Sequence, residues 1–243
     1  MSVNWSQHRR EAHHLGRLQE FLKQIVYGGN DGIVTTFAIV AGFAGAAAEN
    51  TAQIGAIAVL VFGLANLFAD AVSMGLGEFL STRSQRDRYF TQRQIELREL
   101  EENPAQERAE LTQFLTERGL STASANAAAA ELMQSPELVA DMMMTYELEM
   151  PDMRNASPAI EGLVTFLAFT VFGAIPLLPY FFASPTAQTF WLSVTATFAA
   201  LVGLGLLRWR ATSEAMIRCV GETLLVGGAC AIVAFAVGAL VGG

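Results

Sequence analysis

Five stretches of this chain are each long and apolar enough to cross a lipid bilayer, and this constrains its fold more than any other feature. They run over residues 25–47, 54–80, 159–183, 187–207 and 217–241. A membrane-spanning helix needs about 20 predominantly apolar residues. Only 16% of the residues are charged, whereas the share in an average soluble domain is about 25%. We therefore predict an all-α integral membrane protein with five transmembrane helices.

The basic residues between these stretches predict the orientation of the spans. Lys and Arg occur in the N-terminal arm, in the long segment after the second span and in the loop before the fifth span, but not in residues 48–53 or 183–186. Because basic loops favour the cytoplasmic side, we expect a cytoplasmic N-terminus and long segment, with the C-terminus on the opposite side. A prokaryotic inner membrane and a vacuole-type membrane both fit. The formal net charge of −8 argues against a nucleic-acid partner.

The distribution of charge divides the chain into four predicted parts. Residues 1–24 form a cytoplasmic N-terminal arm, with basic residues and apolar residues at helical spacing that favour an amphipathic helix. Residues 25–82 hold the first two spans, 83–158 a cytoplasmic helical insert, and 159–243 the last three spans. No stop signal follows the second span, so we expect one long helix that continues into the insert.

Helix-start signals divide the insert into about four helical segments. Asn103-Pro104 and Ser135-Pro136 each combine an N-cap residue with proline at the first helical position, and Gln106 would complete a capping box with Asn103. Gly119 is expected to end one helix, and Ser121 to begin another. Whether Pro104 breaks the helix before it is left open by the sequence.

Carboxylates lie inside two of the predicted spans. Asp31 follows Asn30 in the first span, and Asp70 is followed by Met74 and Glu78 at helical spacing in the second. An ionisable group in a span costs roughly 2.5–3.5 kcal/mol or more at the bilayer centre, and such groups often line ion pathways. We therefore predict a cation path along these five residues. The alternative is a structural polar contact between two helices.

The insert carries a second group of candidate ligands, made of glutamate and methionine residues three or four positions apart. They are Glu96, Glu99, Glu107, Glu110, Met143, Met144 and Glu147. Carboxylates bind hard divalent cations, and thioether sulfur adds a preference for transition metals. The set suits Fe²⁺, Mn²⁺, Co²⁺ or Zn²⁺. The alternative is that the glutamates form a solvated helix face and the methionines fill a core.

Taken together, these motifs resemble those of the vacuolar iron transporter family, which includes the yeast vacuolar iron and manganese transporter. The resemblance extends from about Leu15 to Gly242 and rests on Gly28-Gly-Asn-Asp-Gly-Ile33, on Ala69-Asp-Ala-Val-Ser-Met-Gly-Leu-Gly-Glu78 and on the insert pattern. It implies a homodimer with the ion path at the interface, and export of Fe²⁺ from the cytoplasm in exchange for protons. It also implies translocation roles for Asp31 and Met74, and metal binding by the seven insert residues.

We accordingly expect a divalent transition-metal transporter, an Fe²⁺/H⁺ antiporter, and no cofactor beyond the metal that it carries. One alternative is a transporter of Mn²⁺ or of divalent cations in general on the same machinery. Another is a membrane-anchored metal buffer or sensor without flux. An enzyme is not expected, since di-iron carboxylate sites on helices usually include Glu-x-x-His, and all three histidines precede residue 15.

Overall fold

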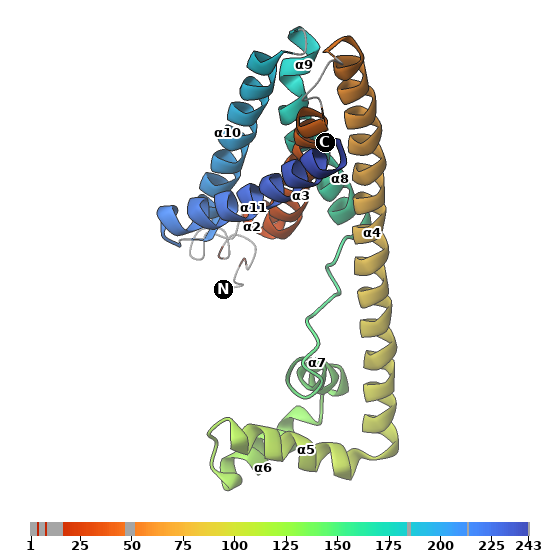
Figure 1. Ribbon diagram of the computed structural model, residues 1–243. Helices are drawn as coiled ribbons and strands as arrows, with labels where there is room; N and C mark the ends of the chain where they lie inside the picture. The colour runs from red at the N-terminus through yellow and green to blue at the C-terminus, as the bar shows by residue number, and fades with distance from the viewer. Residues whose placement is uncertain are drawn as a thin grey trace. The chain divides into compact units, whose positions relative to one another are not determined.

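The computed structural model describes residues 4, 8, 17–46, 52–183, 186–212 and 214–242, and every regular element in them is a helix (Figure 1). The predicted all-α fold class is therefore confirmed for this part of the chain. The residues form two compact units. The first, which we call the spanning unit, comprises Met1–Phe79 and Ala159–Gly243. The second, which we call the charged unit, comprises Leu80–Pro158.

The predicted amphipathic arm at residues 1–24 falls mostly outside the described residues. Its described portion contains α2 (Arg17–Glu20) and the beginning of α3 (Leu22–Ala46). The expectation of an amphipathic helix over the preceding residues therefore stays a prediction.

Four helical segments are long and apolar enough to cross a membrane among the residues that the structure describes. They are Ile57–Glu102, Pro158–Phe182, Ala187–Thr212 and Met216–Val237. The predicted first span corresponds to α3, which has 25 residues but is not among these four segments; it carries Gln24, Asn30 and Asp31. The structure thus supports a membrane protein with several apolar helices, and the count of five spans stays a prediction.

Helix α4 (Ala52–Glu102) is one continuous helix of 51 residues, as the missing stop signal predicted (Figure 1). At 1.5 Å per residue it is about 75 Å long. The hydrocarbon core of a bilayer is only about 30 Å thick. No proline interrupts α4, and it ends directly before Asn103-Pro104. The helix is therefore long enough to contribute to both units.

The third predicted span, 159–183, is not one regular helix. It consists of α8 (Pro158–Ala174), the 3₁₀ turn η1 (Ile175–Leu177) and α9 (Leu178–Phe182). Pro176 and Pro179 explain the change, because proline lacks the backbone N–H that an α-helix interior requires. Helices α10 (Ala187–Thr212) and α11 (Met216–Gly242) complete the spanning unit, and α11 contacts both α3 and α10.

Glycines allow the helices of the spanning unit to approach one another closely. A Cβ atom on Gly75 of α4 would lie 2.9 Å from the backbone oxygen of Gly162 in α8. A Cβ atom on Gly28 of α3 would lie 2.8 Å from the backbone oxygen of Thr165, also in α8. Small residues at such contacts let membrane helices pack backbone to backbone. The glycines therefore place α3 and α4 against the same neighbour, α8.

In the charged unit, α5 (Pro104–Glu117), α6 (Thr122–Leu132) and α7 (Pro136–Tyr146) pack around a core that includes Leu100, Leu111 and Val139. Pro104 breaks the preceding helix, which the sequence left open. Ser121 caps α6 by accepting a hydrogen bond from the Ser124 N–H.

The predicted capping box at α5 is wrong. The Asn103 side chain makes no cap hydrogen bond, and the Gln106 side chain donates instead to Glu110, one turn further on. Proline at the first helical position already fixes φ, and the Gln106 N–H donates to the Asn103 carbonyl oxygen at 3.0 Å instead of to its side chain, so α5 begins without the box. The glycine signal agrees with the structure, since Gly119 adopts a φ of 104° after the end of α5.

An ionic network holds α7 against α4 within the charged unit. The Arg93 guanidinium contacts both Glu137 and Asp141, with its Nε 2.8 Å from an Asp141 oxygen. Arg154 donates to the other Asp141 oxygen at 2.6 Å and to Asp152 at 2.7 Å. The Arg93 side chain is only 13% exposed. Partly buried, multiply bonded pairs of this kind are stronger than surface ion pairs.

Candidate ion path and metal-binding residues

The structure brings Asp31 and Asp70 together from two helices of the spanning unit. Asp31 lies in α3 and Asp70 in α4, close enough for the charge of one carboxylate to act on the other. The Asn66 amide donates a hydrogen bond of 2.6 Å to Asp70 from one turn earlier in α4. Both aspartates are half-buried. Two carboxylates whose charges interact, one of them bonded to an amide, can attract a cation between the two helices.

Met74 lies one turn after Asp70 on α4, as the spacing predicted. It is half-buried and packs against the apolar core of the spanning unit, which includes Phe37, Leu67 and Phe169. Its thioether therefore follows the carboxylate along one side of α4. This position is compatible with a packing role and with a role as a soft ligand.

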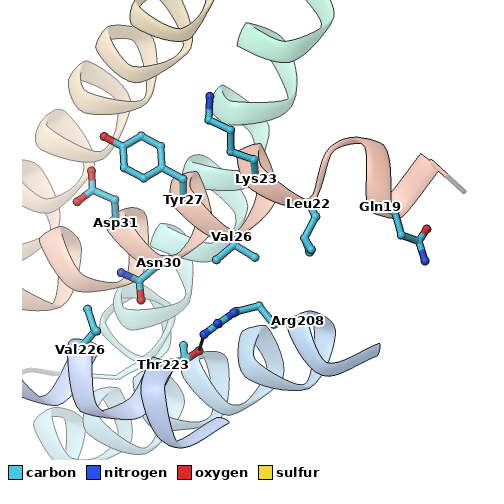
Figure 2. Close-up of a pocket in the computed structure, with 10 residues that line it drawn as sticks. All are labelled: Gln19, Leu22, Lys23, Val26, Tyr27, Asn30, Asp31, Arg208, Thr223 and Val226. Atoms are coloured by element: carbon cyan, nitrogen blue, oxygen red, sulfur yellow. Dashed lines mark hydrogen bonds between the residues drawn. The ribbon is translucent and has the colours of Figure 1, made fainter. Parts of the chain in front are cut away.

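Asn30 and Asp31 line a cavity of about 700 Å³ on α3 (Figure 2). Figure 2 shows Asn30 pointing from α3 toward α11, whereas Asp31 projects from another side of α3. Arg208 of α10 borders the same cavity, and its guanidinium lies 3.0 Å from a Glu222 oxygen. Two of the five residues that the sequence proposed for a cation path are thus accessible from an open, largely apolar cavity.

Glu78 takes part in a separate polar cluster rather than in the Asp31–Asp70 pair. The Gln24 amide donates to Glu78 and to Glu161, with both distances equal to 3.0 Å. Lys23 Nζ lies 3.1 Å from the same Glu78 oxygen. Sequence reasoning did not identify Gln24, because one glutamine at the start of a helix gives no local signal. Its importance follows only from the packing of three helices.

Two glutamates of the charged unit are buried although no cation faces them. Glu96 of α4 and Glu107 of α5 are each only 3% exposed, and Glu107 Oε2 is buried without a hydrogen-bond partner in the described part of the chain. Burial, reinforced by neighbouring glutamates, raises the pKa of Glu96 and that of Glu107 to about 7. Near neutral pH each carboxyl can therefore hold either a proton or a cation.

Other predicted ligands lie around these two. Burial and then the charges of Glu110 and Glu99 raise the pKa of Glu147, which follows α7. The break at Pro104 thus lets carboxylates converge from different helices, which was one of the two arrangements that the sequence allowed. Within the residues described, however, no three His, Cys, Asp or Glu side chains are positioned to hold a metal ion together. The charges of these glutamates therefore raise pKa values within the group, but the oxygen atoms of the group do not surround a common point where a metal ion could bind.

The two predicted methionine ligands are buried in α7. Met143 is 2% exposed and belongs to the core formed with Leu100, Leu111 and Val139, and Met144 is fully buried. The packing of Met143 agrees with the alternative that methionines fill the core. A ligand role for either thioether stays a prediction.

Comparison with known proteins identifies the family. The model of the VIT family matches residues 22–239, which include the helices that carry every candidate residue named above. The chain belongs to the VIT family. The resemblance inferred from the sequence is thereby confirmed.

Named relatives cover most of this VIT-family chain. Vacuolar iron transporter 2 of Oryza sativa subsp. japonica is 33% identical over 89% of the chain and 85% of the relative. Vacuolar iron transporter 1 of Tulipa gesneriana is 31% identical over 97% of the chain and 92% of the relative. A vacuolar iron transporter of Toxoplasma gondii is 31% identical over 93% and 76%. As a member of this family, the chain is a membrane transporter and not an enzyme.

Proposed function

We propose that this protein carries Fe²⁺ out of the cytoplasm in exchange for protons. The observation that carries the proposal is the pairing of Asp31 with Asp70 between α3 and α4, inside a unit built from apolar helices. A membrane anchor needs no such pair, because charged groups among apolar helices are costly. The names of the relatives supply the metal, iron.

Exchange follows from the chemistry of a carboxylate. One carboxylate oxygen binds either a proton or a metal ion, so occupation by one excludes the other. A higher proton concentration on the far side of the membrane then displaces Fe²⁺ and drives its release. In this mechanism Asp31 and Met74 bind the ion midway, while Asn30, Asp70 and Glu78 line the rest of the path.

The charged unit has the role of cytoplasmic metal capture in this proposal. Its support is the burial of Glu96 and Glu107 without a facing cation, which is costly unless a proton or a metal ion compensates it. Glu99, Glu110 and Glu147 add negative charge around them. The two methionines Met143 and Met144 would supply the soft ligands.

We further propose that each copy crosses the membrane five times. Two copies then assemble with the ion path at their interface. The support is the apolar surface that the spanning unit leaves exposed. Large apolar side chains exposed on α4, α8, α10 and α11 include Phe62, Leu76, Val171, Phe198 and Ile232. Lipid and a second copy would divide this surface between them.

The decisive experiment is transport of Fe²⁺ into proteoliposomes under an imposed pH gradient. We expect flux that follows the gradient and falls at least about tenfold in Asp31→Ala, since a ligand of the carried ion is lost. Gly42→Ala is the matched control on α3, because a Cβ atom there meets nothing within 4 Å. Wild-type flux in Asp31→Ala would contradict the role of Asp31.

Mn²⁺ as a competitor in the same assay tests the main alternative. Residue types alone do not separate the two metals, because selectivity depends on site geometry and metal availability. Stronger transport of Mn²⁺ than of Fe²⁺ would make the protein a manganese transporter on the same machinery. Metal binding without any flux would make it a membrane-anchored buffer or sensor.

A further inference from the structure

Three helices of the spanning unit meet at a polar cluster that shares only Glu78 with the path proposed through Asp31. Gln24 comes from α3, Glu78 from α4 and Glu161 from α8. The Gln24 amide nitrogen lies 3.0 Å from Glu78 Oε1 and 3.0 Å from Glu161 Oε2. Two carboxylates that are distant in sequence are thus held by one amide group.

One buried oxygen atom of this cluster, Gln24 Oε1, accepts no hydrogen bond within the described part of the chain. Gln24 is 5% exposed, and its Oε1 is buried without a hydrogen-bond donor in the described part of the chain. An unsatisfied buried acceptor costs about 1–3 kcal/mol. It lies beside two carboxylates, so the cluster has an excess of oxygen acceptors. Such an excess is typical of a site that accommodates a positive ion.

We propose that Gln24, Glu78 and Glu161 form a second cation site, which binds a hard divalent ion through three oxygen atoms from three helices. Rotation of the Gln24 amide would exchange its nitrogen and oxygen positions and turn Oε1 toward the carboxylates. In an octahedral sphere with metal–oxygen distances of about 2.1 Å, neighbouring ligands lie about 3.0 Å apart. That spacing equals the present distances from the amide to the carboxylates.

Lys23 supplies the compensating charge when no metal ion is bound. Its Nζ lies 3.1 Å from Glu78 Oε1, and its side chain is 69% exposed. Because the ammonium group is largely exposed to solvent, an arriving divalent ion can displace it into water. The site is therefore open to exchange rather than permanently occupied.

The position of the cluster suggests its role. Glu78 lies two residues before Leu80, where the chain enters the charged unit, and Glu161 lies three residues after Pro158, where the chain leaves it. This inference rests on the proposed transport function, in which the site would bind an ion within the spanning unit, close along the chain to the charged unit. Its all-oxygen ligands favour Mn²⁺, Mg²⁺ or Fe²⁺ over softer ions such as Cu⁺.

The substitution Gln24→Glu separates a cation site from a structural contact. It removes the amide donor and adds a third carboxylate. At a cation site we expect Mn²⁺ to bind at least about tenfold more tightly and to raise the melting temperature. At a structural contact the variant is destabilised by charge repulsion, and Mn²⁺ does not restore its stability.

The measurement uses the full-length protein in lipid nanodiscs and counts bound Mn²⁺ by electron paramagnetic resonance of the free ion. Glu161→Gln should bind one Mn²⁺ fewer per chain than the wild type. Gln188→Glu is the matched control, because it adds the same charge at an exposed position of α10, and it should leave binding unchanged. Equal stoichiometry in Glu161→Gln and wild type, or weaker binding by Gln24→Glu, would overturn the site.

Failure of this inference is distinguishable from failure of the proposed function. Wild-type flux together with unchanged Mn²⁺ binding in the variants rejects the second site and leaves transport standing. Absence of flux together with loss of one Mn²⁺ in Glu161→Gln rejects transport and supports the site.

Discussion

Both units of this protein bury glutamates, but they compensate the negative charge in different ways. In the spanning unit, Glu78 is paired with Lys23 and bonded to the Gln24 amide. In the charged unit, Glu96 and Glu107 face other glutamates and no cation, and burial raises the pKa of each to about 7. The difference means that Glu96 and Glu107 depend on protons or metal ions for charge compensation, whereas Glu78 has Lys23 as a counter-charge when no metal ion is bound.

The charged unit does not lack arginines. Arg93 and Arg154 are there, but both are bonded to aspartates, Asp141 and Asp152. The arginines stabilise the packing of α7 against α4 and do not neutralise Glu96. Because these two arginines are bonded to aspartates, they leave the carboxylates of Glu96 and Glu107 free to bind a ligand.

The largest expected effect is on the pH dependence of metal binding. If one metal ion displaces protons from both Glu96 and Glu107, whose pKa values are about 7, apparent Mn²⁺ affinity rises about 100-fold from pH 6 to pH 8 and then levels off. In Glu96→Gln the same change should shrink to about tenfold. Calorimetric titration of the full-length protein at several pH values measures both. An affinity that does not vary with pH would exclude Glu96 and Glu107 as ligands.

The second prediction compares the loss of stability when an arginine is removed from a half-buried ion pair of the charged unit and from an exposed ion pair of the spanning unit. Arg93→Met leaves Asp141 and Glu137 without this partner, and because the Arg93 side chain is only 13% exposed, we expect destabilisation by about 3 kcal/mol. Arg218 of α11 also contacts two carboxylates, those of Glu214 and Glu222, but it is 66% exposed. Arg218→Met should destabilise the protein much less, because exposed ion pairs are weak and screened by solvent. Denaturant unfolding followed by circular dichroism measures both, and equal losses would contradict the difference.

A third prediction concerns the stability of the metal-free protein. The folded-state pKa of Glu107 is raised from 4.5 to about 7, so the folded state binds more protons than the unfolded state between these values. Stability therefore falls as the pH rises from about 4.5 to 7. Glu107→Gln should remove this loss, which is on the order of 3 kcal/mol at pH 8, and have little effect near pH 4. A variant less stable than wild type at pH 8 without metal would refute the prediction.

The smallest effect compares two glycines of α4. Gly75→Ala places a Cβ atom 2.9 Å from the Gly162 oxygen, and Gly77→Ala places one where nothing lies within 4 Å. Overpacking should cost the first about 1–2 kcal/mol, whereas the second should be neutral or slightly stabilising, since alanine favours helix by about 1 kcal/mol. Thermal unfolding in detergent compares them. A large loss in Gly77→Ala would mean that another chain covers this face.

The sequence predicted elements best where a local signal defined them. The absence of a break predicted the long helix α4, and Ser121 and Pro136 predicted where α6 and α7 begin. Local signals failed at the Asn103 capping box, where proline alone suffices. In the third span the apolar run located the segment, which matches Pro158–Phe182, but it did not predict the 3₁₀ turn at Ile175–Leu177.

The sequence by itself determined the helical class, the apolar stretches and the family, because these depend on composition, periodicity and short motifs along the chain. It also placed Asp70, Met74 and Glu78 at helical spacing. Only the tertiary structure decided that Glu96 and Glu107 are buried together and that Gln24 joins Glu78 to Glu161. The physical reason is that burial and charge compensation depend on which helices pack together, and residues as far apart as 24 and 161 carry no local record of that packing.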